Sequence, residues 1–346
     1  MKITKILVAL SFLFATVSAH AGSLNVTGNM ETTYHSQSEN TTGNPLGMDR
    51  ELKFSGSTEL DSGITVSVMQ DTSDNLGYGN SQISFGGIST PAGALTVYIG
   101  SDSDPVDAID DITPSAYEEA NGSGSGTYVD IGSNAGQMGL GLKLDLPIVG
   151  GVNYKYYPKV DAVKNADNSS SGSVAKATGS VGSAYSVTLK TDLGATLGML
   201  DGLTLTNGYA EIENSTIATT KDKWELTSAL NYKIGALSLG AQKKVASLGE
   251  TAAVNTTTDT EAVVHDDLVV GIAYAVNDAL SISYNRYTSD RSNSATVQSR
   301  QETDAINVGY TMGGMTLGFQ DASTDNAGYV LDSKDDTRTI GISVAF

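Results

Sequence analysis

The chain has 346 residues, of which 39% are hydrophobic and 17% charged, and 39 acidic against 20 basic residues give a formal charge of −19. This acid excess argues against nucleic-acid binding, which needs basic patches on the protein surface. Since Cys is absent, disulfides and cysteine-ligated zinc are excluded. Only three His are present, which argues against histidine-based catalysis.

Residues 1–21 have the three parts of a secretory signal peptide. Lys2 and Lys5 give the positive start, an apolar stretch follows, and Ala19 and Ala21 frame the cleavage site. Its removal would leave 18 basic and 39 acidic residues, a charge of −21, in one domain over 22–346. The longest clean apolar run elsewhere, 268–276, is too short for a membrane-spanning helix. An exported soluble β protein and an outer-membrane β-barrel remain.

Beyond the signal peptide, apolar and polar residues alternate in segment after segment. Ile64, Val66 and Val68 show the pattern early in the chain, and Ile340 and Ile342 show it near the end. A period of two is typical of strands whose two faces meet different environments. Sixteen strands are predicted, at residues 24–36, 48–60, 63–72, 79–90, 93–101, 137–146, 149–160, 181–191, 202–213, 222–235, 236–247, 266–276, 279–290, 302–312, 315–324 and 336–346. The weakest predictions are 202–213 and 236–247, and losing one hairpin would leave fourteen.

The connections between these strands are alternately short and long. Short turns such as 61–63 and 313–314 alternate with polar connections over about 37–47, 101–136, 161–180, 248–265, 291–301 and 325–335. This predicts an all-β, up-and-down antiparallel transmembrane barrel with the long loops at one end. Lipid cannot satisfy an open sheet edge, so the last strand must pair with the first. Sixteen strands leave room for a water-filled bore.

The longest connection carries seven acids and no base through residue 126: Asp102, Asp104, Asp107, Asp110, Asp111, Glu118 and Glu119. One interpretation is an acidic wall across the bore, and the other is an ordinary solvated loop whose like charges repel one another. The aspartates Asp102, Asp104, Asp107, Asp110 and Asp111 are also a candidate site for Ca²⁺, although their spacing is not that of an EF-hand.

Basic residues predicted in the pore wall are Arg50, Lys53, Lys143, Lys155, Lys190 and Lys233. The lysines have inward parity, as Leu52 and Phe54 around Lys53 illustrate, and a lysine facing lipid near the midplane would cost about 2–4 kcal/mol. Opposed rows of charge would create a field across the bore, and the acid excess would favour cations at low salt. The alternative is that these residues are solvated away from the narrowest point.

From Ser23 to Phe346 the chain resembles the Gram-negative trimeric porins of the sixteen-stranded type. The stretch 24–30, LNVTGNM, is similar to the family's opening strand, and 53–66 to its second hairpin. The final Phe346 resembles the signal that outer-membrane proteins present to the barrel assembly machinery. The resemblance implies a homotrimer in the outer membrane among lipid and lipopolysaccharide, a third loop folded into the bore, no cofactor, and passive diffusion of small hydrophilic solutes.

Other functions stay open at this point. An enzyme would need a catalytic motif, but the mature chain has no G-x-S-x-G, H-E-x-x-H or C-x-x-C, and its two histidines, His35 and His265, are expected in external loops. We therefore expect a channel and not an enzyme. A substrate-specific channel is the main alternative, and an adhesive or structural surface β protein is the less favoured one.

Overall fold

The structure is a computed structural model that describes residues 23–38, 43–72, 78–101, 104–120, 128–129, 131, 138–147, 149–158, 182–198, 200–213, 222–249, 263–293, 296–297 and 299–346. The predicted signal peptide, 1–21, lies outside these residues. The strands are β1 (Ser23–Gln37), β2 (Leu46–Glu59), β3 (Thr65–Thr72), β4 (Tyr78–Thr90), β5 (Gly93–Gly100), β6 (Gly139–Leu146), β7 (Gly150–Tyr157), β8 (Ala184–Asp192), β9 (Leu203–Ile212), β10 (Lys223–Ile234), β11 (Leu237–Ser247), β12 (Val264–Ala275), β13 (Leu280–Asn293), β14 (Thr296–Val297), β15 (Gln301–Met312), β16 (Met315–Asp325) and β17 (Lys334–Ala345). The short helical elements are η2 (Asp107–Ile109), α2 (Leu193–Leu197) and η3 (Ala327–Tyr329).

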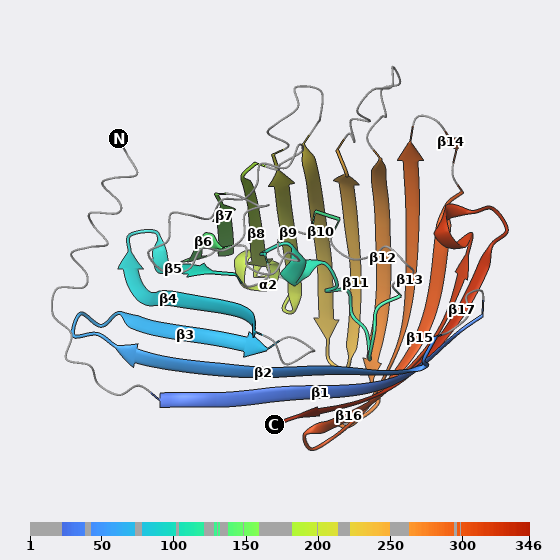
Figure 1. The fold of residues 1–346 in the computed structure, drawn as a ribbon, viewed down its shortest axis with the longest axis horizontal. Coiled ribbons are helices and arrows are strands. Elements are labelled where there is room, and N and C mark those ends of the chain that lie inside the picture. Colours follow the sequence, from blue (N-terminus) through green and yellow to red (C-terminus); the bar gives the residue numbers. More distant parts are fainter. Residues whose placement is uncertain are drawn as a thin grey trace.

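The strands form one closed antiparallel barrel (Figure 1). Sixteen long strands build the wall, and the two-residue β14 pairs with β13. The barrel closes where β1 pairs with β17 as well as with β2. The backbone of Phe346 completes this closure, because its N–H donates to Gly28 O at 3.0 Å and Gly28 N–H donates to Phe346 O at 2.9 Å. The predicted fold class and all sixteen strands are confirmed.

The two faces of the barrel wall differ as the alternation predicts. Leu24, Val26 and Met30 of β1 lie on one face, and Ile340 and Ile342 of β17 lie on the same face, all at least 42% exposed. The opposite face carries polar and charged side chains. Aliphatic rows exposed on the outer face match hydrocarbon, and a polar inner face matches water. We call these the outward face and the inward face.

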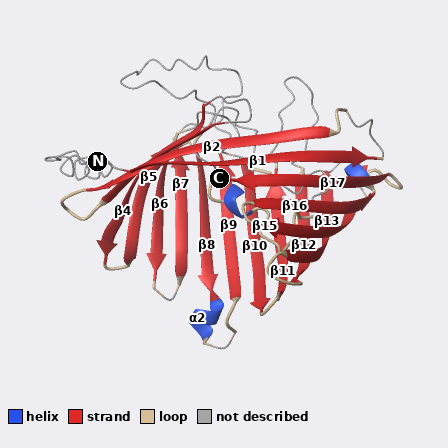
Figure 2. Ribbon diagram, turned by 90° about the horizontal axis from the view of Figure 1, so that it is seen from below, coloured by secondary structure: helices blue, strands red, loops and turns tan. Residues whose placement is uncertain are grey.

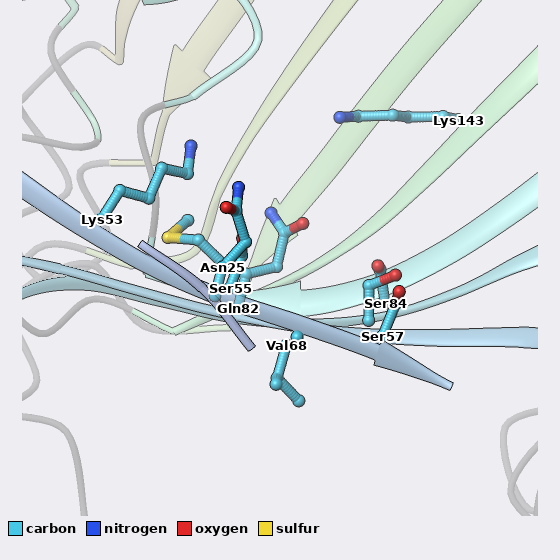
Figure 3. A pocket seen from close by; sticks show the side chains of 11 residues that line it. Asn25, Lys53, Ser55, Ser57, Val68, Gln82, Ser84 and Lys143 are labelled. Carbon is cyan, nitrogen blue, oxygen red and sulfur yellow. The ribbon is translucent and has the colours of Figure 1, made fainter. Parts of the chain in front are cut away.

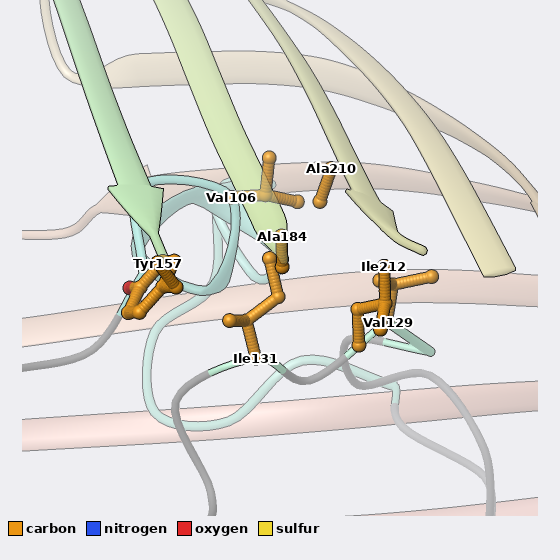
Figure 4. Packing of buried hydrophobic residues seen from close by; sticks show 7 residues of the cluster. All are labelled: Val106, Val129, Ile131, Tyr157, Ala184, Ala210 and Ile212. Atoms are coloured by element: carbon orange, nitrogen blue, oxygen red, sulfur yellow. The ribbon is translucent and has the colours of Figure 1, made fainter. Parts of the chain in front are cut away.

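Buried apolar residues gather where the long connection after β5 meets the inward face. Figure 4 shows Val106, Val129 and Ile131 of this connection against side chains of β7, β8 and β9. A second cluster joins Ala120 to Val269 and Tyr287 and to neighbouring alanines. The hydrophobic core is therefore small and serves to hold the connection on the wall.

The short turns lie together at one end of the barrel, and α2 occupies one of them (Figure 2). Asp192 caps this helix by accepting a hydrogen bond from Ala195 N at 3.0 Å, and Gly198 ends it in the left-handed conformation. Within the described residues, no helix is both long enough and apolar enough to cross a membrane.

Candidate functional site

The described stretch 104–120 of the long connection is anchored first at β8. Asp104 is fully buried, and its carboxylate accepts hydrogen bonds from Ser186 Oγ at 2.9 Å, Val106 N at 2.9 Å and Asp107 N at 3.1 Å. Ile131 N also donates to it, at 3.3 Å. Burial raises the pKa of Asp104 despite these donors. Asp104 therefore shapes the connection and is not available to a solute.

From β8 the connection follows the inward face toward β16, and amide side chains of the strands bind its backbone. Gln242 donates to Ile109 O at 2.7 Å, and Asn231 donates to Ile112 O at 2.9 Å. Asn285 donates to Pro114 O at 2.9 Å, and Gln320 donates to Glu119 O at 2.9 Å. Figure 1 shows this teal segment running past β9 toward β13. Backbone carbonyls that would otherwise be buried without partners are thus satisfied by the wall.

Glycines on the inward face mark the path of the connection. A Cβ added at Gly208 would lie 2.7 Å from Ile109, one at Gly240 would lie 2.3 Å from Pro114, and one at Gly318 would lie 2.2 Å from the ring of Tyr117. Glycine within a strand commonly marks close approach of another backbone or ligand. The sequence contains these glycines, but their purpose is visible only with the connection in place.

The path ends at the first strand. Tyr117 donates its hydroxyl to Glu31 Oε1 of β1 at 2.6 Å, and its ring covers Gly318 and Gly341. Sequence reasoning missed Glu31, although its position between the outward Met30 and Thr32 gives it inward parity. Glu31 adds a carboxylate of the wall to those of the connection.

The return limb of the connection is held by two further carboxylates of the wall that sequence reasoning missed. Glu225 accepts from Tyr128 N at 2.7 Å and Val129 N at 3.0 Å. Asp267 accepts from Tyr128 Oη at 2.5 Å. The ring of Tyr128 stacks on His265 with centroids 4.3 Å apart. His35 and His265 lie in β1 and β12, so their expected place in external loops is wrong.

The acids of the connection fall into two groups. Glu119 is buried and accepts from Thr113 N at 2.5 Å, whereas Asp111 and Glu118 are exposed and Asp107 and Asp110 are half-buried. Burial raises the pKa of Glu119 to about 7, and partial desolvation of the carboxyl, together with the charges of Glu31 and Asp111, raises the pKa of Glu118. Partial desolvation and the charge of Asp110 also raise the pKa of Asp111. Asp102 lies outside the described residues.

These carboxylates do not assemble a metal site in what the structure describes. No group of three or more His, Asp or Glu side chains there could hold a metal ion. Asp104, one of the proposed calcium ligands, already receives four hydrogen bonds from the protein. The donors present favour a structural role for this carboxylate over cation coordination.

Two of the predicted lysines share one hollow of about 410 Å³ on the inward face. Figure 3 shows Lys53 of β2 and Lys143 of β6 on the same side of the strands, with Val68 on the opposite side. Lys155 is fully buried, and its Nζ lies 4.9 Å from the ring centroid of Tyr157. Lys190 and Lys233 are exposed on the inward face near the short turns.

The structure corrects the position of Arg50. It pairs with Met30 of β1, and it follows Met48 in the same row of β2. Since paired residues of an antiparallel ladder point to one face, Arg50 lies on the outward face and not in the pore wall. Lys244, which was not predicted, lies instead on the inward face, where it donates to Asp110 O at 3.4 Å. Its inward position could have been predicted from the alternation of the strand, because the adjacent Lys243 points outward, where it forms an ion pair with Asp266.

A closed sixteen-stranded barrel with an aliphatic outward face and a charged inward face defines a transmembrane β-barrel channel. The sequence matches the family of Gram-negative porins over residues 7–316, and the chain belongs to this family. It is an outer-membrane channel for passive diffusion, as the resemblance implied.

Solved structures share the fold at low sequence identity. The anion-selective porin from Comamonas acidovorans aligns with a TM-score of 0.65 and 15% identity over 94% of this chain and 100% of that one. Outer-membrane expressed OmpT of Vibrio cholerae aligns with a TM-score of 0.66 and 10% identity over 95% of this chain and 99% of that one. The trimer form of in-vitro folded OmpT of Vibrio cholerae aligns with a TM-score of 0.66 and 10% identity over 94% of this chain and 100% of that one. A comparison with curated proteins gives no match.

Proposed function

We propose that this porin is a cation-preferring diffusion channel in which residues 104–120 form an acidic constriction. The observation that carries the proposal is the contact path of this segment across the inward face, from Ser186 to Glu31, with Asp111 and Glu118 left exposed. Carboxylates beside a narrow aqueous path raise the local concentration of cations and lower that of anions. Lys53 and Lys143 share a hollow of the inward face and would add basic charge to the bore.

Planar-bilayer recording tests this proposal. In a gradient of KCl around 0.1 M the reversal potential should show cation preference, which should shrink at 1 M because the screening length falls from about 10 Å to about 3 Å. The triple variant Asp107→Asn, Asp110→Asn, Asp111→Asn should lose most of the preference at low salt.

A matched control removes the same charge from the outward face. Asp266, Asp304 and Asp321 lie there in exposed ion pairs, and their replacement by Asn should leave the reversal potential unchanged. Anion preference in the unmodified protein, or equal effects of the two triple variants, would contradict an acidic constriction. Vesicle-swelling assays with sugars and amino acids identify which hydrophilic solutes pass through the channel. The proposal gives no residue a catalytic role.

The proposal includes a homotrimer, for which the trimer form of a structural relative is the precedent. On the outward face of β1–β5, Arg50 is the one charged side chain among the described residues. Burial against another copy would remove this arginine from lipid, where such a charge costs about 2–4 kcal/mol near the midplane. Chemical cross-linking in native membranes tests it, and a monomer there would overturn it. Lipopolysaccharide, lipid and the assembly machinery complete the proposed partners.

A further inference from the structure

The inward face has a second charged hollow, of about 640 Å³, beside the end of the connection. Its acidic lining residues are Glu31 and Asp49 of the first two strands, Glu118 of the connection and Asp335 of β17. No Lys or Arg is among the lining residues that the structure describes, and His35 is the one titratable nitrogen side chain. Gln37 donates to Asp335, and Tyr117 donates to Glu31 at 2.6 Å, so these carboxylates are held in position.

The lysine hollow described above has the opposite sign. Its charged lining residues are Lys53 and Lys143. The other lining side chains are uncharged and include Asn25, Ser55 and Gln82. Acids do occur nearby on the inward face, since Asp71 pairs with Lys53 and Asp145 lies two residues from Lys143. Asp71 is turned to the backbone, where it accepts a hydrogen bond from Asn80 N.

The order of the two hollows along the barrel follows from the direction of β1 and β2. Glu31, His35 and Gln37 lie toward the end of β1 that leads into a long connection, as does Asp49 at the beginning of β2. Lys53 and Ser57 lie toward the other end of β2, which leads into a short turn. In a barrel of this family the long connections face the outside, so a solute entering from outside meets the acidic hollow first.

We propose that the bore is electrically polarised along its axis, with Glu31, Asp49 and Asp335 as selectivity residues of an outer acidic compartment and Lys53 and Lys143 as those of an inner basic one. The inference rests on the proposed function only in requiring an open aqueous bore. It adds wall residues to those of the constriction. It also predicts that the conductance differs between the two directions of current.

Two compartments of opposite sign in series conduct unequally in the two directions. When the outer side is positive, cations enter through the acidic compartment and anions through the basic one, so both accumulate where the compartments meet. When the outer side is negative, both are drawn out of this region and the conductance falls. The effect requires a screening length comparable with the bore, and it should therefore be strong at 0.1 M and vanish at 1 M.

Current–voltage curves in symmetrical KCl test the proposal on the full mature protein. At 0.1 M the current with the outer side positive should exceed that at the opposite voltage by about 1.5-fold or more. Because the chain contains no cysteine, Val330→Cys places a unique thiol in the exposed connection before β17. An impermeant thiol reagent added to one chamber then reports which way the channel is inserted.

The triple variant Glu31→Gln, Asp49→Asn, Asp335→Asn should reduce the ratio toward 1, and Lys53→Met with Lys143→Met should do the same. Asp266→Asn, Asp304→Asn, Asp321→Asn on the outward face is the matched control and should retain the ratio. A linear curve at 0.1 M, or a ratio unchanged by both inward variants, overturns axial polarisation. A linear curve combined with a cation-selective reversal potential would leave the proposed function standing.

Discussion

The carboxylates of the long connection differ in their surroundings and therefore in their roles. Asp104 and Glu119 are buried against backbone donors, whereas Asp111 and Glu118 are exposed on the same segment. A count of acids in the sequence treats them alike. Their separate environments lead to separate predictions for pH and for mutation.

Acidic pH should weaken the cation preference in a range where ordinary carboxylates remain ionised. The raised pKa of Glu119, about 7, means that this side chain gains a proton as the pH falls from 8 to 6, and the raised pKa values of Glu118 and Asp111 add to the loss of negative charge on acidification. Reversal potentials measured from pH 8 to pH 5 should show the decline. Glu119→Gln should remove the part centred near pH 7, and an identical profile in this variant would contradict the assignment.

Substitution of Asp104 should release the connection from the wall. Asp104→Ala leaves three backbone donors without their acceptor, and the two buried ones cost about 1–3 kcal/mol each, whereas Asp104→Asn keeps one acceptor oxygen and removes a poorly solvated charge. Chymotrypsin should then cleave the alanine variant at Tyr117 or Tyr128, while the asparagine variant resists as the unmodified protein does. Equal resistance in both variants would show that other contacts suffice.

Glycines in the strands leave the space into which the long connection packs. Gly318→Ala would place a methyl group against the ring of Tyr117 and push the ring into the bore, breaking its hydrogen bond to Glu31. Single-channel conductance should fall. Gly151→Ala is the matched control, because its Cβ would meet only Asp145 at 3.5 Å. Unchanged conductance in Gly318→Ala, with normal folding, would mean that Tyr117 does not limit the bore.

The elements also show what a sequence can and cannot predict. Strand positions are local properties, since alternation in 279–290 or 315–324 is visible without knowing any partner, and all sixteen are confirmed. Parity is local too, and the parity of Leu52 and Phe54 that placed Lys53 inward also places Arg50 outward, so that error was avoidable. The contact of Asp104 with Ser186 joins residues 82 positions apart, and no local pattern reveals it.

The whole molecule depends on closing the ring of strands. Within the membrane the outward face is not in contact with water, so any unpaired backbone group at the junction of β1 and β17 would lack water as a substitute partner. Phe346 lies at this junction, and its ring occupies the space beside Gly28 where a Cβ would come within 2.4 Å. It therefore has a structural role in addition to its predicted role as the signal for the assembly machinery.

Two variants separate these roles. Deletion of Phe346 removes both hydrogen bonds with Gly28, each lost bond in lipid costing several kcal/mol, and it should reduce folding in vesicles that contain no assembly machinery. Phe346→Ala keeps the backbone pair, so it should fold in vesicles almost normally but accumulate poorly in cells. Heat-modifiable electrophoretic mobility measures the folded fraction in both settings. Normal accumulation of Phe346→Ala in cells would exclude the ring as an assembly signal, and normal folding after deletion would show that the ring of strands closes without it.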